Sequence, residues 1–177
     1  VGLYGRVNNQ RTVKWIKSDY INEHPNLNMY KVVLPKSNGS GAFGETLTSP
    51  SVVEPQIGHT QTFISLGAYK TETEANNLLS YIKTKFLRAL LGILKVTQDN
   101  KKAVWAYIPL QDFTSSSDIN WAVPTSEIDK QLYKKYELSK AEKELQKNEK
   151  KVNEELEKAE NELKDAYKEI EELEKPE

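Results

Sequence analysis

The chain has 177 residues, with 25 Lys or Arg and 26 Asp or Glu, so its formal net charge is −1. This length suits one ordinary domain with an appendage rather than two complete cores. The charge is unevenly divided, because residues 125–177 carry 12 Lys against 17 acids, whereas residues 1–124 carry 13 Lys or Arg against 9 acids. A mildly basic body suits a polyanionic partner, although solubility explains the same balance.

Composition excludes several classes of chemistry. The chain contains no cysteine, which excludes disulfides and thiolate catalysis and is compatible with a reducing cytoplasm. No apolar run reaches membrane-spanning length, and the first ten residues lack the apolar core of a signal peptide. We therefore expect a cytoplasmic protein with no membrane partner. Because the chain begins with Val1 rather than Met, we also expect that it is a piece of something longer.

Two β-like runs, Tyr30–Leu34 and Gln61–Leu66, flank a long segment rich in Gly, Ser, Thr and Pro. Upstream, the sequence predicts a short strand over Thr12–Ile16 and a helical turn from Ser18 to Ile21. A compact domain seldom keeps so long an irregular connection unless the loop is functional or disordered. The segment between the two runs is therefore the first candidate for a binding loop.

Downstream of the second run, Thr71 and Glu74 form a capping-box pattern, and apolar residues then recur every three or four positions. This pattern predicts one long core helix over residues 72–94. Alternation over Val104–Ile108 predicts a strand that ends before Pro109, and a short helix follows from Thr125 or Ser126 to Tyr136. The predicted fold class is α+β, with a mixed β-sheet body around one long core helix.

From Ser139 the sequence contains no Gly or Pro until Pro176, and apolar residues again step by three and four. One narrow apolar stripe on a long polar helix requires a partner helix, so we predict a coiled-coil-type helix that pairs with another copy or another subunit. We expect three parts, with boundaries at 1–124, 125–138 and 139–177. The candidate oligomerisation residues are Leu145, Asn148, Val152, Leu156, Ala159, Leu163, Ala166, Ile170 and Leu173.

The clearest enzyme-like motif is the spacing of Gly39, Gly41 and Gly44, which matches a dinucleotide fingerprint after a strand. The following residues contain two prolines and no helical period, so no helix N-terminus is available to hold a pyrophosphate. The two histidines, His24 and His59, have no neighbours at metal-ligand spacing. No nucleophile elbow, phosphate loop or catalytic carboxylate pair is visible. We therefore predict no catalytic centre, no metal and no cofactor in this chain.

Two loops carry the short polar and basic side chains that reach base edges and phosphates in protein–DNA complexes. The alternative is that these loops are simply solvated. The candidate DNA-binding residues are Lys36, Ser37, Asn38, Ser40, Thr46, His59, Thr60, Gln61, Thr97, Gln98, Asn100, Lys101 and Lys102.

Three runs, YKVVLPKSNGSGAFGE, the stretch from GHTQTFISLG to AYIPLQDF, and SDINWAVPTSEIDKQLYKKYEL, together resemble a known family. The likeness is to the C-terminal specificity region of bacterial adenine-N6 DNA methyltransferases of type II restriction–modification systems. It is closest in kind to the type IIG enzymes and the TaqI-like specificity domain, and it covers roughly residues 5–138. The resemblance implies a target recognition domain that reads double-stranded DNA while a separate domain flips and methylates the adenine.

The chain lacks the NPPY-type methyltransferase motif, the glycine motif for S-adenosylmethionine and the PD-ExK nuclease pattern. The resemblance therefore implies a fragment or a separate specificity subunit, with S-adenosylmethionine and Mg²⁺ only on the missing or partner methyltransferase/endonuclease. The helix predicted after Leu138 departs from the family and is similar to the spacer helices of type I specificity subunits. The alternative is a coiled-coil interaction or assembly protein, such as a decoy, that oligomerises through residues 139–173.

Overall fold

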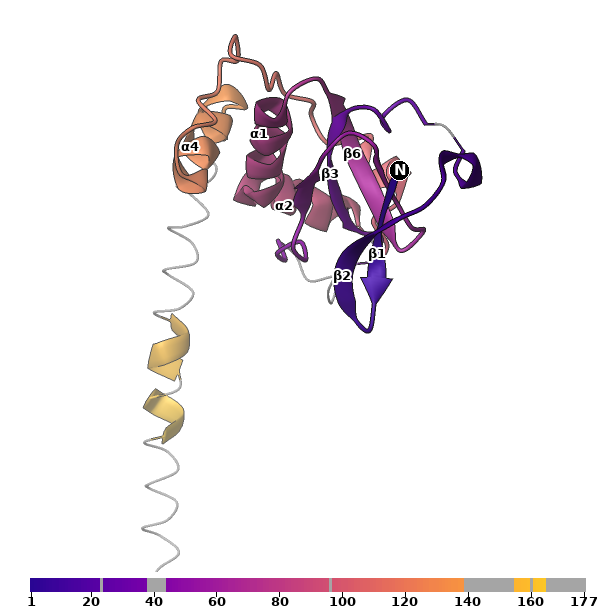
Figure 1. Cartoon of the computed structure of the whole chain (residues 1–177). Coiled ribbons are helices and arrows are strands. Elements are labelled where there is room, and N and C mark those ends of the chain that lie inside the picture. The colour runs from indigo at the N-terminus through magenta and orange to yellow at the C-terminus, as the bar shows by residue number, and fades with distance from the viewer. Residues whose placement is uncertain (23, 38–43, 96, 139–154, 160, 165–177) are drawn as a thin grey trace, which may run out of the picture. The chain divides into compact units, whose positions relative to one another are not determined.

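The computed structural model describes residues 1–22, 24–37, 44–95, 97–138, 155–159 and 161–164 (Figure 1). Two small sheets and several helices make up this part of the chain, which confirms the predicted mixed α+β class. The chain divides into two compact units, Val1–Leu132 and Tyr133–Glu177, and each is described by itself. The boundaries at 124 and 138 stay predictions.

The first sheet, sheet A, has the strand order β2-β1-β5. Strand β1 (Gly2–Val7) pairs antiparallel with β2 (Gln10–Trp15) and parallel with β5 (Ile57–His59). The turn between β1 and β2 is Asn8–Asn9, and both residues have positive φ (48° and 64°), as a two-residue type I′ hairpin requires. The predicted strand over Thr12–Ile16 is confirmed by β2, and the short 3-10 helix η1 (Ser18–Tyr20) follows it.

The second sheet, sheet B, is antiparallel with the order β4-β3-β6. Strands β3 (Tyr30–Pro35) and β6 (Phe63–Tyr69) confirm the two predicted runs, although β6 begins two residues later than expected. The prediction that the whole connection between them is irregular is wrong, because it contains β4 (Ser51–Val53) and β5. Each of these strands is three residues long, which is too short to show a period-two pattern.

Strand β3 forms the centre of the core and is buried on both faces. Val32, Val33 and Leu34 expose no more than 1% of their surface. Val33 belongs to a buried cluster with Val53 and Phe63, against which Tyr4 and Ile57 of sheet A pack. Because side chains alternate along a strand, Val32 and Leu34 point to the other face, where helix α1 (Glu72–Lys83) contacts β3 (Figure 1).

The predicted single helix over residues 72–94 is wrong, because α1 ends at Lys83 and a second helix, α2 (Lys85–Leu94), begins after Thr84. Thr84 is fully buried with an extended backbone, and its hydroxyl accepts from the amide of Leu87 (3.1 Å). The Asp129 carboxylate accepts from the amides of Lys85 (3.1 Å) and Phe86 (2.9 Å). These two side chains satisfy the amides of a new helix start, which explains the break. The predicted capping box of Thr71 and Glu74 is confirmed.

The strand predicted over Val104–Ile108 is also wrong, because a short helix, α3 (Lys102–Trp105), occupies this position. The amides of Tyr107 and Ile108 donate to the carbonyls of Val104 (3.3 Å) and Trp105 (3.1 Å), so this backbone bonds locally rather than in a ladder. Helix α4 (Thr125–Lys135) confirms the predicted short helix and buries Ile128 and Leu132.

Most of the predicted coiled-coil helix lies outside the described residues, including Leu145, Asn148, Val152, Ala166, Ile170 and Leu173. Residues 155–159 and 161–164 are helical, and Lys158 Nζ lies 3.7 Å from Glu162 Oε1. In the part of the chain with assigned structure, no helix has both the length and the apolar character that crossing a bilayer requires.

Replacing Asp129 with Ala should lower the free energy of unfolding by about 1–3 kcal/mol, because the part-buried Lys85 amide and the buried Phe86 amide at the start of α2 lose their acceptor. Urea denaturation measures the change. The matched control is Glu127→Ala on the same helix, where the exposed carboxylate contacts only the exposed Lys130 among described partners. Equal midpoints for the two variants would contradict the assigned cap.

Candidate nucleic-acid interface

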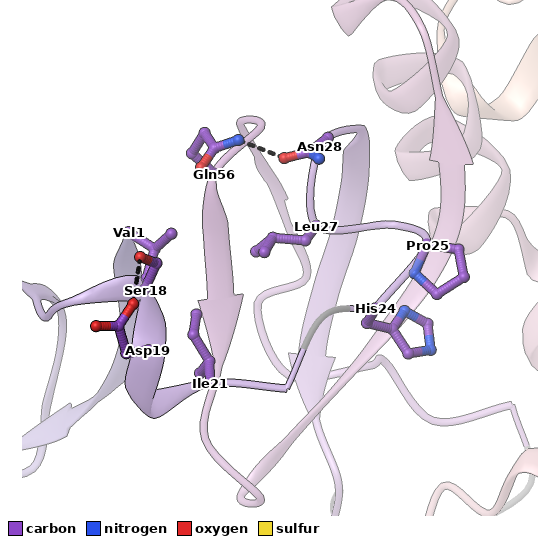
Figure 2. Close-up of a pocket in the computed structure, with 9 residues that line it drawn as sticks. All are labelled: Val1, Ser18, Asp19, Ile21, His24, Pro25, Leu27, Asn28 and Gln56. Atoms are coloured by element: carbon purple, nitrogen blue, oxygen red, sulfur yellow. Dashed lines mark hydrogen bonds between the residues drawn. The ribbon is translucent and has the colours of Figure 1, made fainter.

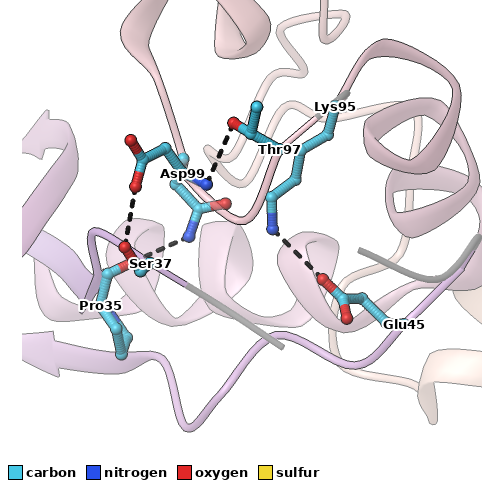
Figure 3. A network of polar contacts seen from close by, with 7 residues as sticks. Pro35, Ser37, Glu45, Lys95, Thr97 and Asp99 are labelled. Carbon is cyan, nitrogen blue, oxygen red and sulfur yellow. Dashed lines mark hydrogen bonds and ion pairs between the residues drawn. The ribbon is translucent and has the colours of Figure 1, made fainter. Parts of the chain in front are cut away.

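The two polar loops that the sequence singled out lie side by side (Figure 3). Ser37 and Asp99 form an isolated antiparallel bridge, and the Ser37 hydroxyl donates to the Asp99 carboxylate at 2.8 Å. The Asn100 amide nitrogen donates to the Lys36 carbonyl at 2.6 Å, and its side-chain Nδ2 donates to the Pro35 carbonyl at 2.8 Å. The end of β3 therefore fixes the position of the loop before α3.

A second set of contacts holds residues 44–46 against α2. The Lys95 ammonium lies 3.2 Å from the Glu45 carboxylate, and the two side chains are only 5% and 17% exposed (Figure 3). Arg88 Nη1 donates to the Gly44 carbonyl (3.1 Å) and to the Thr46 hydroxyl (3.0 Å). The backbone before and after positions 38–43 is thus attached to the same region of the fold. Two candidate residues, Asn38 and Ser40, lie outside the described residues.

A pocket of about 460 Å³ opens beside these contacts. It brings together three residues that the sequence predicted, Lys36, Ser37 and Gln61. The β1–β2 hairpin adds Arg6 and Arg11, which residue-type reasoning missed. The remaining lining residues are Pro35, Thr48, Thr62 and Phe63.

Among the residues that the structure describes, three cations and no carboxylate line this pocket. Arg11 is held in place, because its Nη2 donates to the Thr48 carbonyl at 3.2 Å and its Nη1 donates to the Ser49 carbonyl. Its guanidinium carbon also lies 5.9 Å from the centre of the Phe63 ring. Arg6 and Lys36 are exposed and form no ion pair with the residues that the structure describes. Within the described residues, the positive charge of Arg6 and Lys36 is therefore not compensated by an ion pair, and the Arg11 guanidinium beside them is held in one position.

His59 and Thr60 form bonds inside the fold. His59 Nδ1 lies 3.0 Å from the Thr60 carbonyl oxygen, and its Nε2 lies 3.1 Å from the Ser65 hydroxyl. The Thr60 and Thr62 hydroxyls are 2.8 Å apart. Both ring nitrogens of His59 are therefore engaged, so a contact with DNA would have to replace one of these bonds.

The loop before α3 presents a mixed set of side chains. Asn100 is only 2% exposed and acts as a spacer between the two loops, so it cannot reach a base without a loop rearrangement. Thr97, Gln98 and Lys101 on the same loop, and Lys102 at the start of α3, are exposed. Asp99 and Asn100, which lie between them in the sequence, bond to the Pro35–Ser37 segment, of which all three residues line the pocket.

A larger pocket, of about 730 Å³, lies between η1, the residues before β3 and the start of β5 (Figure 2). It is lined by Val1, Ser18, Asp19, Ile21, His24, Pro25, Leu27, Asn28 and Gln56. These described lining residues include the Asp19 carboxylate and no Lys or Arg, so they suit a polyanion poorly. Among the described residues, no three His, Cys, Asp or Glu side chains gather as a metal site requires.

Comparison with protein-family models, with curated proteins and with solved structures finds no match. The functional interpretation therefore depends on the geometry of the cationic pocket and the adjoining loops.

Replacing Glu45 with Gln should lower the free energy of unfolding by about 1–3 kcal/mol, because it removes the carboxylate that lies 3.2 Å from the nearly buried Lys95 ammonium. Chemical denaturation measures this loss. Glu127→Gln breaks an ion pair of 2.7 Å whose side chains are 70% and 49% exposed, and it should cost about 0.5 kcal/mol or less. If both variants lose equally little, the Glu45–Lys95 pair does not anchor the loop.

Proposed function

We propose that this chain is a sequence-recognition module for double-stranded DNA in a bacterial restriction–modification system. In this proposal it directs an adenine-N6 methyltransferase/endonuclease to its target and is not catalytic alone. The supporting observation is that segments far apart in the sequence meet around one cation-lined pocket, namely Lys36–Ser37, Gln61–Phe63 and the β1–β2 hairpin. The Thr97–Lys102 loop adjoins them through Asp99 and Asn100.

The residue types around the pocket divide into two chemical roles. Lys36, Lys101 and Lys102 supply positive charge for phosphates, which gives affinity without sequence information. Gln61 and Gln98 offer paired donor and acceptor groups that suit adenine in the major groove. Together the two sets provide the two components that specific DNA binding needs.

The contacts behind these loops favour recognition over a merely solvated surface. A loop that reads bases must be held in one position by the scaffold behind it. Here the Asn100 side chain bonds to the end of β3, and Glu45 pairs with Lys95 at the end of α2. In this proposal S-adenosylmethionine and Mg²⁺ belong to the partner methyltransferase/endonuclease, in line with the resemblance of residues 5–138 to specificity domains.

Replacing Lys36 and Gln61 together with Ala should abolish preference for the DNA site without unfolding the chain, because both side chains line the pocket at its surface. The preferred site is first found by selecting bound duplexes from a randomised pool with the wild-type chain. Loss of one bidentate base contact alone costs about 1–3 kcal/mol of discrimination.

The control is Asn76→Ala with Lys83→Ala, which removes the same net charge and one amide from exposed positions of α1. It should keep the wild-type preference. If the pocket variant still enriches the same site as the wild-type chain, the base-reading assignment is wrong. If the wild-type chain enriches no site, sequence recognition itself is wrong.

A second candidate function is assembly through the C-terminal helix, favoured by the exposure of two leucines one heptad apart. Leu156 is 58% exposed and Leu163 is 59% exposed, with Ala159 between them in the sequence. Leucines at this spacing are typical of the seam of a coiled coil, which a second helix would cover. In this role the chain would act as an interaction protein rather than as a DNA reader.

Replacing Leu156 and Leu163 together with Glu should reduce self-association, because two seam positions become charged. Analytical ultracentrifugation of the full chain over a concentration series measures the change. Glu155→Ala with Glu162→Ala alters exposed charges instead and serves as the control. A wild-type chain that remains monomeric at all concentrations would exclude self-pairing.

A further inference from the structure

The β1–β2 hairpin places two arginines directly opposite each other. The register pairs Val7 with Gln10 next to the turn, and Arg6 with Arg11 one step further along. Side chains of such a cross-strand pair lie on the same face and close together, and like charges there are destabilising. Neither strand contains an acidic residue to relieve this repulsion. The hairpin therefore concentrates positive charge at one point of the pocket.

A third cation approaches the same point from another part of the chain. Lys36 follows β3 and lines the pocket with both arginines, together with the neutral polar side chains of Ser37 and Gln61. Asp99 accepts a hydrogen bond from Ser37 but does not line the pocket. Among the described lining residues there are thus three cations and no carboxylate, a charge balance that suits an anionic ligand.

One of the arginines is already preorganised. Arg11 uses N–H groups on the carbonyls of Thr48 and Ser49 and stacks against Phe63, which fixes the plane of its guanidinium. A guanidinium carries five N–H donors, so further donors remain for a ligand. A fixed guanidinium loses less conformational entropy when it binds an anion. Arg6, directly opposite Arg11 in the hairpin, is exposed and offers a second guanidinium to the same ligand.

We propose that this pocket binds a phosphate group, with Arg6 and Arg11 donating to its oxygens and Lys36 adding a point charge. A phosphate spreads its charge over several oxygens, so three cations from different directions can share it, whereas a carboxylate offers only two oxygens. The phosphate is either a phosphodiester of DNA or a free phosphate. The first source rests on the proposed function, because the pocket adjoins the loops assigned to DNA recognition.

The experiment uses the full chain and the variant Arg6→Gln, because the exposed Arg6 side chain forms no hydrogen bond or ion pair with the described residues, so the variant should keep the fold. Lys14→Gln is the matched control, since it removes the same charge from the same hairpin. Arg11 and Val13 are two residues apart on β2 and share one face of the sheet. Lys14 is the next residue, so its side chain lies on the opposite face. Circular dichroism checks that both variants fold.

The first measurement is the melting temperature in sodium phosphate against sodium chloride at equal ionic strength. A ligand that binds only the folded state raises the melting temperature. The wild-type chain and Lys14→Gln should gain stability in phosphate, and Arg6→Gln should lose most of that gain. This measurement detects a free-phosphate site without DNA.

The second measurement is the salt dependence of binding to a mixed-sequence DNA duplex. Arg6→Gln should reduce the slope of log K against log salt by about 0.9, the value for one lost phosphate contact, while Lys14→Gln leaves it unchanged. A reduced slope supports a DNA phosphodiester as the ligand. If the increase in melting temperature in phosphate depends on Arg6 but the salt slope of DNA binding does not change, free phosphate is the supported ligand instead.

The proposal is overturned if neither measurement depends on Arg6, or if Lys14→Gln behaves as Arg6→Gln does. The second result would mean that only net charge matters. Failure of sequence recognition is read separately, from the selection of duplexes by the wild-type chain, because a phosphate site carries no sequence information.

Discussion

The burial of β3 on both faces is the constraint on which the rest of the structure depends. At its start, Lys31 is only 1% exposed, and its ammonium donates to the carbonyls of Asn26 (3.0 Å) and Met29 (2.9 Å). Burial lowers the pKa of Lys31, and these carbonyl dipoles offset part of the cost of the buried charge. At the other end of the strand, the Pro35 and Lys36 carbonyls accept from Asn100. One strand thus positions the packing layers and the candidate interface.

The elements that sequence reasoning found are those whose signals are local. The β-branched run of β3, the capping box of Thr71 and the apolar spacing of α4 each lie within a few consecutive residues. The break at Thr84 depends on Asp129, which is more than forty residues away, so the continuous apolar stripe over residues 72–94 concealed it. Alternation alone misassigned Val104–Ile108, because a period-two pattern needs a neighbouring strand to become a ladder.

The residues of the candidate site also divide into those with a local sequence signal and those that depend on long-range contacts. Lys36, Ser37 and Gln61 were predicted from residue type and loop position, and the pocket includes all three. Arg6 and Arg11 were missed because their proximity depends on hairpin register, for which the Asn8–Asn9 turn was the available signal. Asn100 has the side chain of a base reader, yet it bonds to the backbone at the end of β3. Residue type therefore identifies which side chains have suitable chemistry, whereas register and burial decide which of them are free to use it.

For the proposed DNA recognition, anchoring of the loops matters because a contact with one base yields little free energy. A good bidentate contact contributes about 1–3 kcal/mol of discrimination, whereas ordering one flexible residue costs about 1–2 kcal/mol. A loop that had to order several residues on binding would lose the energy of its contacts. In this chain the Asn100–Pro35 bond, the Glu45–Lys95 pair and the Arg88 contacts with residues 44–46 are formed before any ligand arrives. The conformational entropy of these anchor residues is therefore lost during folding and not during binding. In the proposed function, more of the free energy of the base contacts would then remain for recognition.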